Sequence, residues 1–426
     1  MTFQAIRFHL IFLILLSPLL SSGLVAGQSD CRITLNSAIT AGGNSPPWLS
    51  PSGEFAFGFR SPSLNKDLFL LSIWFDKVPE LTIAWSKNDH PFVLYDSQGH
   101  EIWKAWTGSQ RSTCAAMLDS GNFVLITGDP SNYIWESFDM PTDTFLPGQR
   151  LPTEGKLTSR QSELNYSNGR FQLRMQRDGN LVLYTIFLPT ESVSDAYWAS
   201  ETDLANSSDT QLVFDEAGFI YLERGNKNIF NVTKRPLGSR QDRSRQNYAV
   251  DTARGSSAWS VVQTTPEDMC AAVLNDIGSG ACGYNSYCVN IDGRPNCFCP
   301  DGYSPLDPLD SHRGCRPNFE LPSCQENGWE SNVEFVEFKE LNNTDWPFTD
   351  YELQTGPEID KERCKEFCLR DCLCAAAIYN GNNCWKKRFP LSNGRQSIDV
   401  NRIALLKVPK DNVTSTVLKP KIGRRT

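Results

Sequence analysis

Hydrophobic and polar residues alternate in short runs from Asp30 to about Trp259. The runs are rich in Phe, Trp, Ile, Val and Tyr, and Gly, Pro, Asn, Asp or Ser interrupts them roughly every ten residues. This spacing predicts short β-strands joined by tight turns, because an extended strand places alternate residues on opposite faces. Few helical periods occur in this part of the chain. We therefore expect a fold dominated by β-structure.

One unit recurs in this region: a polar residue, a glycine and then alternating apolar residues. It occurs as "SPSGEFAFGF", "YDSQGHEIW", "LDSGNFVLI", "RDGNLVLY" and "FDEAGFIYL". A single hairpin of this kind cannot bury its apolar face, whereas several hairpins packed around a shared axis can. The repeat predicts barrels or prisms of short strands.

The fourth unit carries a polar set that the other units do not have in full. Its members occupy every second position: Gln176, Asp178, Asn180, Val182 and Tyr184. An extended strand would project these side chains on one face. Carboxylates, carboxamides and a phenol can bond to sugar hydroxyls, and a valine can lie against a sugar ring. We expect a carbohydrate-binding site here; the alternative is an inherited strand that binds no ligand.

The N-terminus has the features of a secretory signal peptide, which we assign to residues 1–27. Arg7 precedes an apolar run from Phe8 to Leu20, and small residues lead to Gly27. The alternative, a membrane anchor, needs an apolar core of about 20 residues, which is longer than this run. No second apolar run of spanning length follows. We expect a soluble, secreted protein with no membrane span.

Composition agrees with export. All 14 cysteines lie after the predicted cleavage point, as expected for a chain whose disulfides form in an oxidising compartment. The net charge of -8, from 41 Lys and Arg against 49 Asp and Glu, argues against nucleic acid as a partner. Five sequons predict N-glycosylation at surface positions: Asn165, Asn206, Asn231, Asn342 and Asn412.

The stretch "QRDGNLVLY" fits the Gln-x-Asp-x-Asn-x-Val-x-Tyr signature of the bulb-type mannose-binding lectins at every defined position. Longer stretches, "WLSPSGEFAFGF", "WESFDMPTDTFLPGQ" and "YSNGRFQLRMQRDGNLVLY", resemble the extracellular half of plant G-type lectin S-receptor-like serine/threonine kinases, especially their lectin receptor kinase subgroup. The resemblance covers nearly all of the chain after the signal peptide. It implies tandem bulb-lectin β-prism domains followed by small disulfide-rich EGF-like and PAN/apple modules.

The resemblance also implies domain boundaries. They are a bulb-type lectin domain at 28–153, a second lectin-like domain at 154–262, an EGF-like module at 266–317, a PAN/apple module at 324–408 and a polar basic tail at 409–426. The chain departs from the family between Asn231 and Trp259, where polar and basic residues replace a further strand. The relatives continue into a spanning helix and a kinase domain, whereas this sequence contains no kinase motif. We therefore expect no enzymatic activity of its own.

Two sets of six cysteines follow the lectin region. For the EGF-like set the resemblance implies the pairs Cys270–Cys288, Cys282–Cys297 and Cys299–Cys315, although spacing alone allows 15 connectivities. In the PAN set, three cysteines recur every fourth residue, on one face of a predicted helix that Asp360 caps. This set is Cys324, Cys364, Cys368, Cys372, Cys374 and Cys384. A structural zinc site is the alternative; Cys31 and Cys114 are left to pair in the first lectin domain.

These observations predict a carbohydrate- or glycoprotein-binding ectodomain that takes part in plant surface perception or defence signalling. We expect no catalytic residues, cofactor or metal, and a mannose-type glycan or glycoprotein as the partner. The predicted location is extracellular, in the apoplast, or at the cell surface together with membrane-held relatives. A second copy of the chain, or a related receptor kinase, is a further expected partner in a homodimer or heteromer. One alternative function is a protein-binding or self-association scaffold with a silent lectin fold. Another is a glycosidase, for which Asp119 and Asp139 are the candidate acids.

Overall fold

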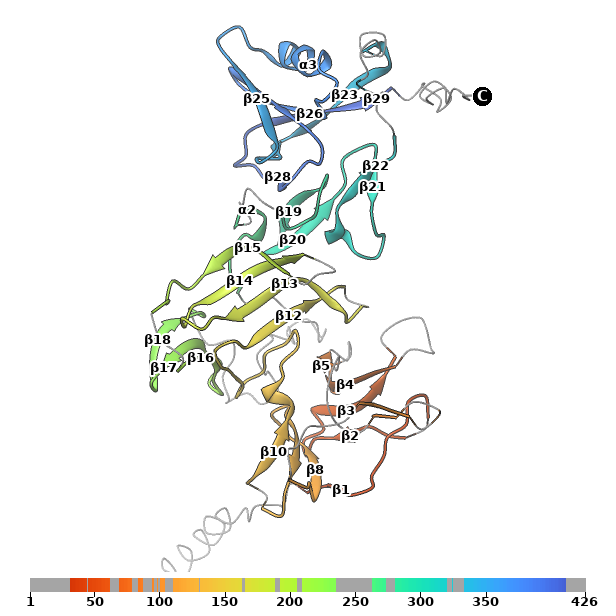
Figure 1. The fold of residues 1–426 in the computed structure, drawn as a ribbon, viewed down its shortest axis with the longest axis vertical. Coiled ribbons are helices and arrows are strands. Elements are labelled where there is room, and N and C mark those ends of the chain that lie inside the picture. Colours follow the sequence, from red (N-terminus) through yellow and green to blue (C-terminus); the bar gives the residue numbers. More distant parts are fainter. Residues whose placement is uncertain are drawn as a thin grey trace, which may run out of the picture. The chain divides into compact units, whose positions relative to one another are not determined.

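The structure is a computed structural model and confirms a mostly β fold (Figure 1). It describes residues 31–43, 45–61, 69–78, 83–86, 94–95, 98, 100–103, 110–129, 131–162, 165–187, 192–204, 209–234, 263–272, 280–319, 324 and 333–410. The chain divides into two compact units, residues 1–61 with 67–140 and residues 62–66 with 141–426. The predicted signal peptide, the tail after residue 410 and the sequons at Asn206 and Asn412 lie outside the described residues.

The first unit is built from antiparallel sheets. One contains β1 (Ile33–Thr34), β8 (Cys114–Met117), β9 (Phe123–Ile126) and β10 (Tyr133–Glu136), which the 3-10 helix η1 (Ser137–Asp139) follows. The second contains β2 (Trp48–Leu49), β3 (Phe55–Arg60), β4 (Leu70–Phe75) and β5 (Ile83–Ser86), and the third contains β6 (Leu94–Tyr95) and β7 (Glu101–Trp103).

Aromatic packing and a disulfide hold the first unit together. The rings of Phe57 on β3 and Phe123 on β9 stack with centroids 4.2 Å apart, so the first two sheets share a core. Cys31 pairs with Cys114, which anchors the first described residues to β8. This disulfide closes a long loop, and such a constraint mainly lowers the entropy of the unfolded chain.

The lectin-like part of the second unit has two antiparallel sheets. They consist of β12 (Lys156–Arg160), β13 (Asn168–Met175), β14 (Leu181–Phe187) and β15 (Ser192–Ala199), and of β11 (Arg150–Leu151), β16 (Thr210–Phe214), β17 (Ile220–Arg224) and β18 (Lys227–Asn231). Their shared core contains Leu151, Leu157, Met175, Leu181, Leu212 and Leu222. Residues 235–262, where the sequence departs from the family, lie outside the described residues.

The boundary between the two lectin-like regions differs from the predicted one near residue 153. Strand β11 pairs with β16, and the N–H of Gly148 donates to the carbonyl of Phe214 at 2.7 Å. Residues 141–153 therefore belong to the second unit, because their main chain completes one of its sheets. A signal for this division is hard to find in sequence, since a two-residue strand has no detectable period.

The EGF-like segment is held by the three disulfides that the family resemblance implies. Its elements are α2 (Met269–Ala272), β19 (Tyr287–Ile291), β20 (Arg294–Phe298), β21 (Tyr303–Pro305), η3 (Ser311–Arg313) and β22 (Cys315–Pro317). Arg170 on β13 reaches this segment from the lectin-like region, donating to the carbonyls of His312 at 2.6 Å and Gly280 at 2.9 Å. The guanidinium therefore bonds main-chain groups of two separate loops.

The PAN region contains a five-stranded sheet and one helix. The sheet has the order β23 (Val336–Asn342), β29 (Ile403–Pro409), β26 (Ala376–Asn380), β27 (Asn383–Lys387), β25 (Asp350–Thr355). The 3-10 helix η4 (Val333–Phe335) precedes it, and α3 (Lys361–Leu369) packs against β26 and β29. The remaining strands are β24 (Thr344–Asp345) and β28 (Gly394–Gln396).

Helix α3 begins as predicted but ends earlier than predicted. The side chain of Asp360 accepts a 2.8 Å hydrogen bond from the N–H of Arg363, which is an N-cap. The helix ends at Leu369, so the prediction that Cys372 shares its face is wrong. The six cysteines pair as Cys324–Cys372, Cys364–Cys384 and Cys368–Cys374. Each sulfur is thus already bonded, which argues against the alternative of a zinc site.

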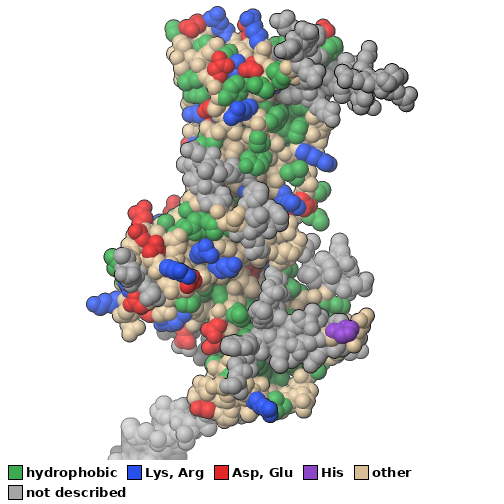
Figure 2. All heavy atoms as spheres, in the orientation of Figure 1, with side chains coloured by type: hydrophobic (Ala, Val, Ile, Leu, Met, Phe, Trp, Pro, Cys, Tyr) green, Lys and Arg blue, Asp and Glu red, His purple; other side chains and the backbone are tan. Residues whose placement is uncertain are grey.

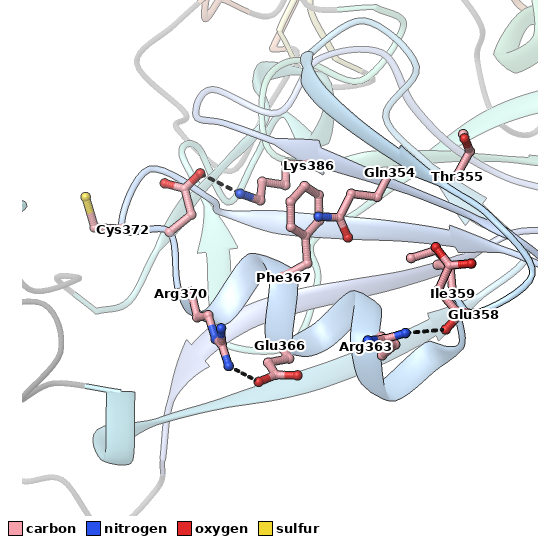
Figure 3. Close-up of a pocket in the computed structure, with 11 residues that line it drawn as sticks. Gln354, Thr355, Glu358, Ile359, Arg363, Glu366, Phe367, Arg370, Cys372 and Lys386 are labelled. Carbon is pink, nitrogen blue, oxygen red and sulfur yellow. Dashed lines mark hydrogen bonds and ion pairs between the residues drawn. The ribbon is translucent and has the colours of Figure 1, made fainter.

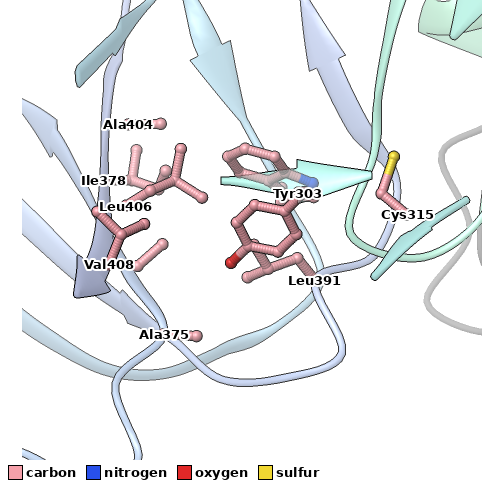
Figure 4. Packing of buried hydrophobic residues seen from close by; sticks show 10 residues of the cluster. Tyr303, Cys315, Ala375, Ile378, Leu391, Ala404, Leu406 and Val408 are labelled. Atoms are coloured by element: carbon pink, nitrogen blue, oxygen red, sulfur yellow. The ribbon is translucent and has the colours of Figure 1, made fainter. Parts of the chain in front are cut away.

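The EGF-like and PAN regions share one sheet and one core. Strand β28 pairs in parallel with β19, so the sheet β20-β19-β28-β24 contains strands from both. The indole Nε1 of Trp346, which is fully buried, donates to the carbonyl of Ser286 at 2.8 Å. Figure 4 shows Tyr303 of the EGF-like region facing the apolar side chains of the PAN strands. Neither region has a complete core without the other.

Three lysines lie buried in the PAN sheet, which the sequence analysis did not predict: Lys386, Lys387 and Lys407. Lys386 bonds the carboxylates of Glu352 and Asp371, and Lys387 bonds those of Asp345 and Asp350. Lys407 donates to the main-chain carbonyl of Asp371 at 2.7 Å. Burial lowers the pKa of Lys407 to about 7, although the charge of Asp371 opposes the shift.

No helix among the described residues is long and apolar enough to cross a membrane.

Gly394 tests the shared core. A Cβ at this position would overlap the carbonyl oxygen of Ser286 and the indole of Trp346. We expect Gly394→Ala to lower the free energy of unfolding by about 1–3 kcal/mol, because a well-packed core cannot admit an added methyl group. Denaturant unfolding measures this cost. The control is Gly128→Ala, whose Cβ would meet open space; an equal loss in both variants would contradict the close approach.

Lys407 predicts a pH dependence of stability. The lysine keeps its proton to about pH 10.5 in the unfolded chain but releases it near pH 7 in the folded one. The unfolded state therefore binds more protons between these values, and the free energy of unfolding should rise with pH across this window. Lys407→Met should remove this part of the slope. The control is Lys227→Met, because Lys227 is exposed. In the same series of thermal unfolding measurements, this variant should show the same slope as the unchanged protein.

Candidate functional site

The repeated sequence unit forms the same glycine turn wherever the structure describes it. Gly53, Gly121, Gly179 and Gly218 have positive φ, between 70° and 95°. The N–H of each donates to the carbonyl three residues before it at 2.9–3.1 Å. A positive φ costs glycine little, which explains why the glycine is the fixed member of the unit. The fifth glycine, Gly99, lies outside the described residues.

A buried hydroxyl then completes each turn. It accepts a hydrogen bond of 2.9–3.2 Å from the N–H of a residue just after the turn. The hydroxyls belong to Ser50, Ser137, Ser200 and Thr233, which bond the N–H groups of Phe55, Phe123, Leu181 and Ile220 respectively. Every turn therefore satisfies a buried main-chain donor that would otherwise be costly.

The residues of the proposed sugar motif do not share one strand as predicted. Gln176, Asp178 and Asn180 lie in the turn between β13 and β14, and only Val182 and Tyr184 lie in β14. The N–H of Gln176 donates to the carbonyl of Asn180 at 2.8 Å, which closes the hairpin. The sequence "RDG" favours a turn at this point. Alternation therefore applies only to the last two motif residues.

Gln176 and Tyr184 nevertheless come together across the hairpin. The Nε2 of Gln176 donates to the phenolic oxygen of Tyr184. Val182 in β14 is only 3% exposed, so its side chain offers little surface to a ligand. The structure thus brings the two ends of the motif into contact, although they are eight residues apart in sequence.

Asn180 is held in one orientation by groups from the end of β15. Its Oδ1 accepts from the hydroxyl of Ser200 at 2.9 Å and from the N–H of Thr202 at 3.4 Å. Thr202 also donates to the carbonyl of Gly179 at 2.8 Å. Because these contacts use the amide oxygen, the Nδ2 group is the part of Asn180 that is suited to donate to a ligand.

The carboxylate of Asp178 stabilises the turn. Its Oδ1 accepts from the N–H of Asn180 at 3.0 Å, as in an Asx turn, and its carbonyl accepts from Leu204. A carboxylate has further lone pairs for the hydroxyl groups of a ligand. The combined set offers an amide donor, a carboxylate acceptor and a phenol, which is suited to a polyhydroxylated molecule.

The sequence analysis missed Ser200 and Thr202 as supports of this site. A signal was present: Ser137 and Ser200 each follow a tryptophan by two residues, in "WES" and "WAS". In the first unit, Asn122 makes the corresponding contact, since its Oδ1 accepts from Ser137 at 3.1 Å. The asparagine therefore has a structural role in the repeat of Asn122 and in the repeat of Asn180. The Gln, Asp and Tyr of the motif occur only in the repeat of Asn180.

The two candidate acids of a glycosidase have separate structural environments. Asp119 accepts a 2.7 Å hydrogen bond from the N–H of Ser52. Burial works to raise the pKa of Asp119, but hydrogen bonds from Ser52 and Ser50 prevail and lower it. Burial, assisted by the charge of Glu136, raises the pKa of Asp139. A lowered pKa does not suit Asp119 to the role of general acid.

One group of potential metal ligands has a simpler explanation. Cys282, Cys297 and His312 lie close together, but the two cysteines form a disulfide. A metal-binding cysteine must be a free thiolate. His312 is within 3.1 Å of the carbonyl of Ala281, and burial lowers its pKa, so a neutral ring that donates to this carbonyl fits the site.

Three of the five predicted glycosylation sites are described, and all three are exposed: Asn165, Asn231 and Asn342. Attachment of glycans to these residues stays a prediction. Asn231 ends β18, and Asn342 ends the edge strand β23.

Ser200 provides a test of the support for Asn180. We expect Ser200→Ala to lower the free energy of unfolding by about 1–3 kcal/mol, because the buried N–H of Leu181 loses its acceptor. Ser131→Ala is the control, since this serine is exposed and its loss should cost no more than about 0.5 kcal/mol. Chemical denaturation of both variants checks the difference; equal stability would contradict the assigned role.

Two family models match the chain. Residues 76–166 match the D-mannose binding lectin family, and residues 333–393 match the PAN-like domain family. The lectin match ends before Gln176, so the motif residues lie outside it. Neither of these families is a kinase family.

Curated relatives extend the similarity along the chain. The G-type lectin S-receptor-like serine/threonine-protein kinase LECRK4 of Oryza sativa subsp. indica is 38% identical over 438 residues, which cover 94% of this chain and 53% of the relative. The kinase RLK1 of Arabidopsis thaliana, described by the same family name, is 37% identical over 83% of this chain and 46% of its own length. A solved lectin of Colocasia esculenta is 26% identical over 21% of this chain and 66% of its own, with a TM-score of 0.16.

The chain thus spans about half the length of the curated relatives that it matches. The aligned half corresponds to the lectin and PAN regions described above. The chain is therefore a homologue of the lectin-containing half of the G-type lectin S-receptor-like serine/threonine-protein kinases.

Proposed function

We propose that this protein binds terminal mannose residues of glycans or glycoproteins through Gln176, Asp178, Asn180 and Tyr184, while Val182, the fifth motif residue, is buried and supports β14. The observation that supports this most directly is the fixed orientation of Asn180, whose Oδ1 is bonded by Ser200 and Thr202. A pre-oriented amide loses little freedom on binding, which favours affinity. The match to the D-mannose binding lectin family supports the sugar class, although its range precedes the motif.

The chemistry of recognition follows from the groups present. Asp178 accepts from sugar hydroxyls, the Nδ2 of Asn180 donates to a sugar oxygen, and Tyr184 shares its hydroxyl between Gln176 and the ligand. Figure 2 shows Lys and Arg side chains interspersed with Asp and Glu on the face drawn. Binding of a neutral sugar then relies on local hydrogen bonds more than on long-range attraction.

A single shallow site of this kind yields weak binding, roughly 4 kcal/mol or a millimolar dissociation constant. Useful avidity requires several linked sites. Pairing with another copy or with membrane-held relatives would supply them. In this role the protein acts outside the cell, in surface perception or defence signalling, and binds its partners without catalysing a reaction. The family relationship and the disulfides of both small modules support this location.

Asp178→Asn tests the sugar site. The amide can still accept from the N–H of Asn180, so the turn is retained while the charge that receives sugar hydroxyls is lost. We expect the dissociation constant for methyl α-mannoside, measured by NMR titration, to be at least tenfold larger. The reason is that charge-assisted hydrogen bonds are stronger than neutral ones.

The matched control is Asp215→Asn, which changes the turn carboxylate of a repeat without the motif. It should bind the mannoside as the unchanged protein does. If unchanged protein and Asp178→Asn bind equally, or neither binds, the motif is silent and the scaffold alternative gains support.

A further inference from the structure

A groove in the PAN region lies between α3 and the strands β25 and β27 (Figure 3). Its volume of about 950 Å³ is large enough for several side chains. Phe367 of α3 and Lys386 of β27 form its floor, with the lysine Nζ 3.8 Å from the centre of the ring. The wall on the sheet side is made by Gln354 and Thr355, the last two residues of β25.

Strand β25 is an edge of the five-stranded sheet. The N–H of Gly356 donates to the carbonyl of Asn382 and continues the ladder with β27. Main-chain groups alternate in direction along an antiparallel pair, so those of Gln354 point toward β27 and those of Leu353 and Thr355 point away from it. The outer side of β25 therefore presents donors and acceptors at a regular spacing.

The two edges of this sheet differ in protection. At the opposite edge, β23 ends at the sequon of Asn342, and its Glu340 is bonded by Lys361 and Lys365 of α3. Strand β25 has no sequon, lysine or proline, and five of its six residues are exposed. Exposed edges that lack such blocking features are templates for strand addition.

The groove is lined by three basic and three acidic side chains: Arg363, Arg370, Lys386, Glu358, Glu366 and Asp371. Lys386 bonds Glu352 and Asp371, and Arg370 bonds Glu366. Within the described residues, Arg363 has a 3.4 Å contact with the main-chain carbonyl of Glu358 and no carboxylate within ion-pair distance. A carboxylate placed in the groove could pair with this guanidinium in a two-point contact.

We propose that an extended peptide segment of a partner protein adds to the edge of β25 and places its alternate side chains in this groove. One acidic side chain pairs with Arg363, and an apolar side chain packs against Phe367. The main chain of the peptide bonds Leu353 and Thr355, which is the mode of peptide recognition by strand addition. This site is separate from the proposed sugar site, so either can fail without the other.

A library of random linear twelve-residue peptides, displayed on phage and selected against the full chain, tests the proposal. We expect enriched sequences with alternating apolar and acidic residues. The best of them, made as a synthetic peptide, should bind at least tenfold more weakly to Leu353→Pro, which lacks the outward N–H. The matched control Leu353→Ala keeps that N–H and should bind within twofold of the unchanged protein.

Two further measurements do not depend on the folding of the proline variant. N-methylation of the peptide at successive positions should weaken binding at alternate residues only. Arg363→Glu should weaken binding at least tenfold, and a peptide with Lys in place of its acidic residue should restore it. Three outcomes overturn the proposal: no enrichment, binding that neither variant changes, or self-association of the chain that Leu353→Pro abolishes.

Discussion

The lectin-like regions depend on one hydrogen bond, which is made by the main-chain N–H just after each described glycine turn. A tight turn with positive φ directs this donor into the core, where it has no strand partner. A serine or threonine hydroxyl accepts it in every described copy; Ser50 belongs to its own turn, and the other three hydroxyls lie 13 to 19 residues after the donor. In the copies closed by Ser137 and Ser200, the same hydroxyl also fixes an asparagine, so one interaction both closes the hairpin and orients a candidate ligand group.

The PAN region is a small module with a limited apolar core, so it needs other sources of stability. Three disulfides and an α-helix supply constraint, and three lysines extend their aliphatic chains through the interior. Each buried ammonium meets carboxylate or carbonyl oxygens, because an unpaired charge in the interior would be prohibitively costly. The network around Asp371 fixes the floor of the groove beside β25, since Lys386 bonds Asp371 and lies against Phe367.

Much of this architecture was predictable from sequence because its signals are local. The glycine of each described repeat and the Asp360 cap act within a few positions, and they predicted the glycine turns and the start of α3 correctly. The alternation failed at Gln176 to Asn180, where turn chemistry replaced the strand. Contacts such as Asn180 with Ser200 or Trp346 with Ser286 join distant segments, and a single sequence carries no direct record of that proximity. The burial of Lys407 was unpredictable for the same reason.

The shared sheet of the EGF-like and PAN regions changes how these two modules can vary through evolution. A module with its own core can be duplicated, lost or exchanged between genes, because its neighbours do not depend on it. Here β19 and β28 pair, and Tyr303 and Trp346 fill a common interior. Recombination between the two would separate complementary halves of one core. The pair should therefore be inherited as a single unit, with substitutions on one side compensated on the other.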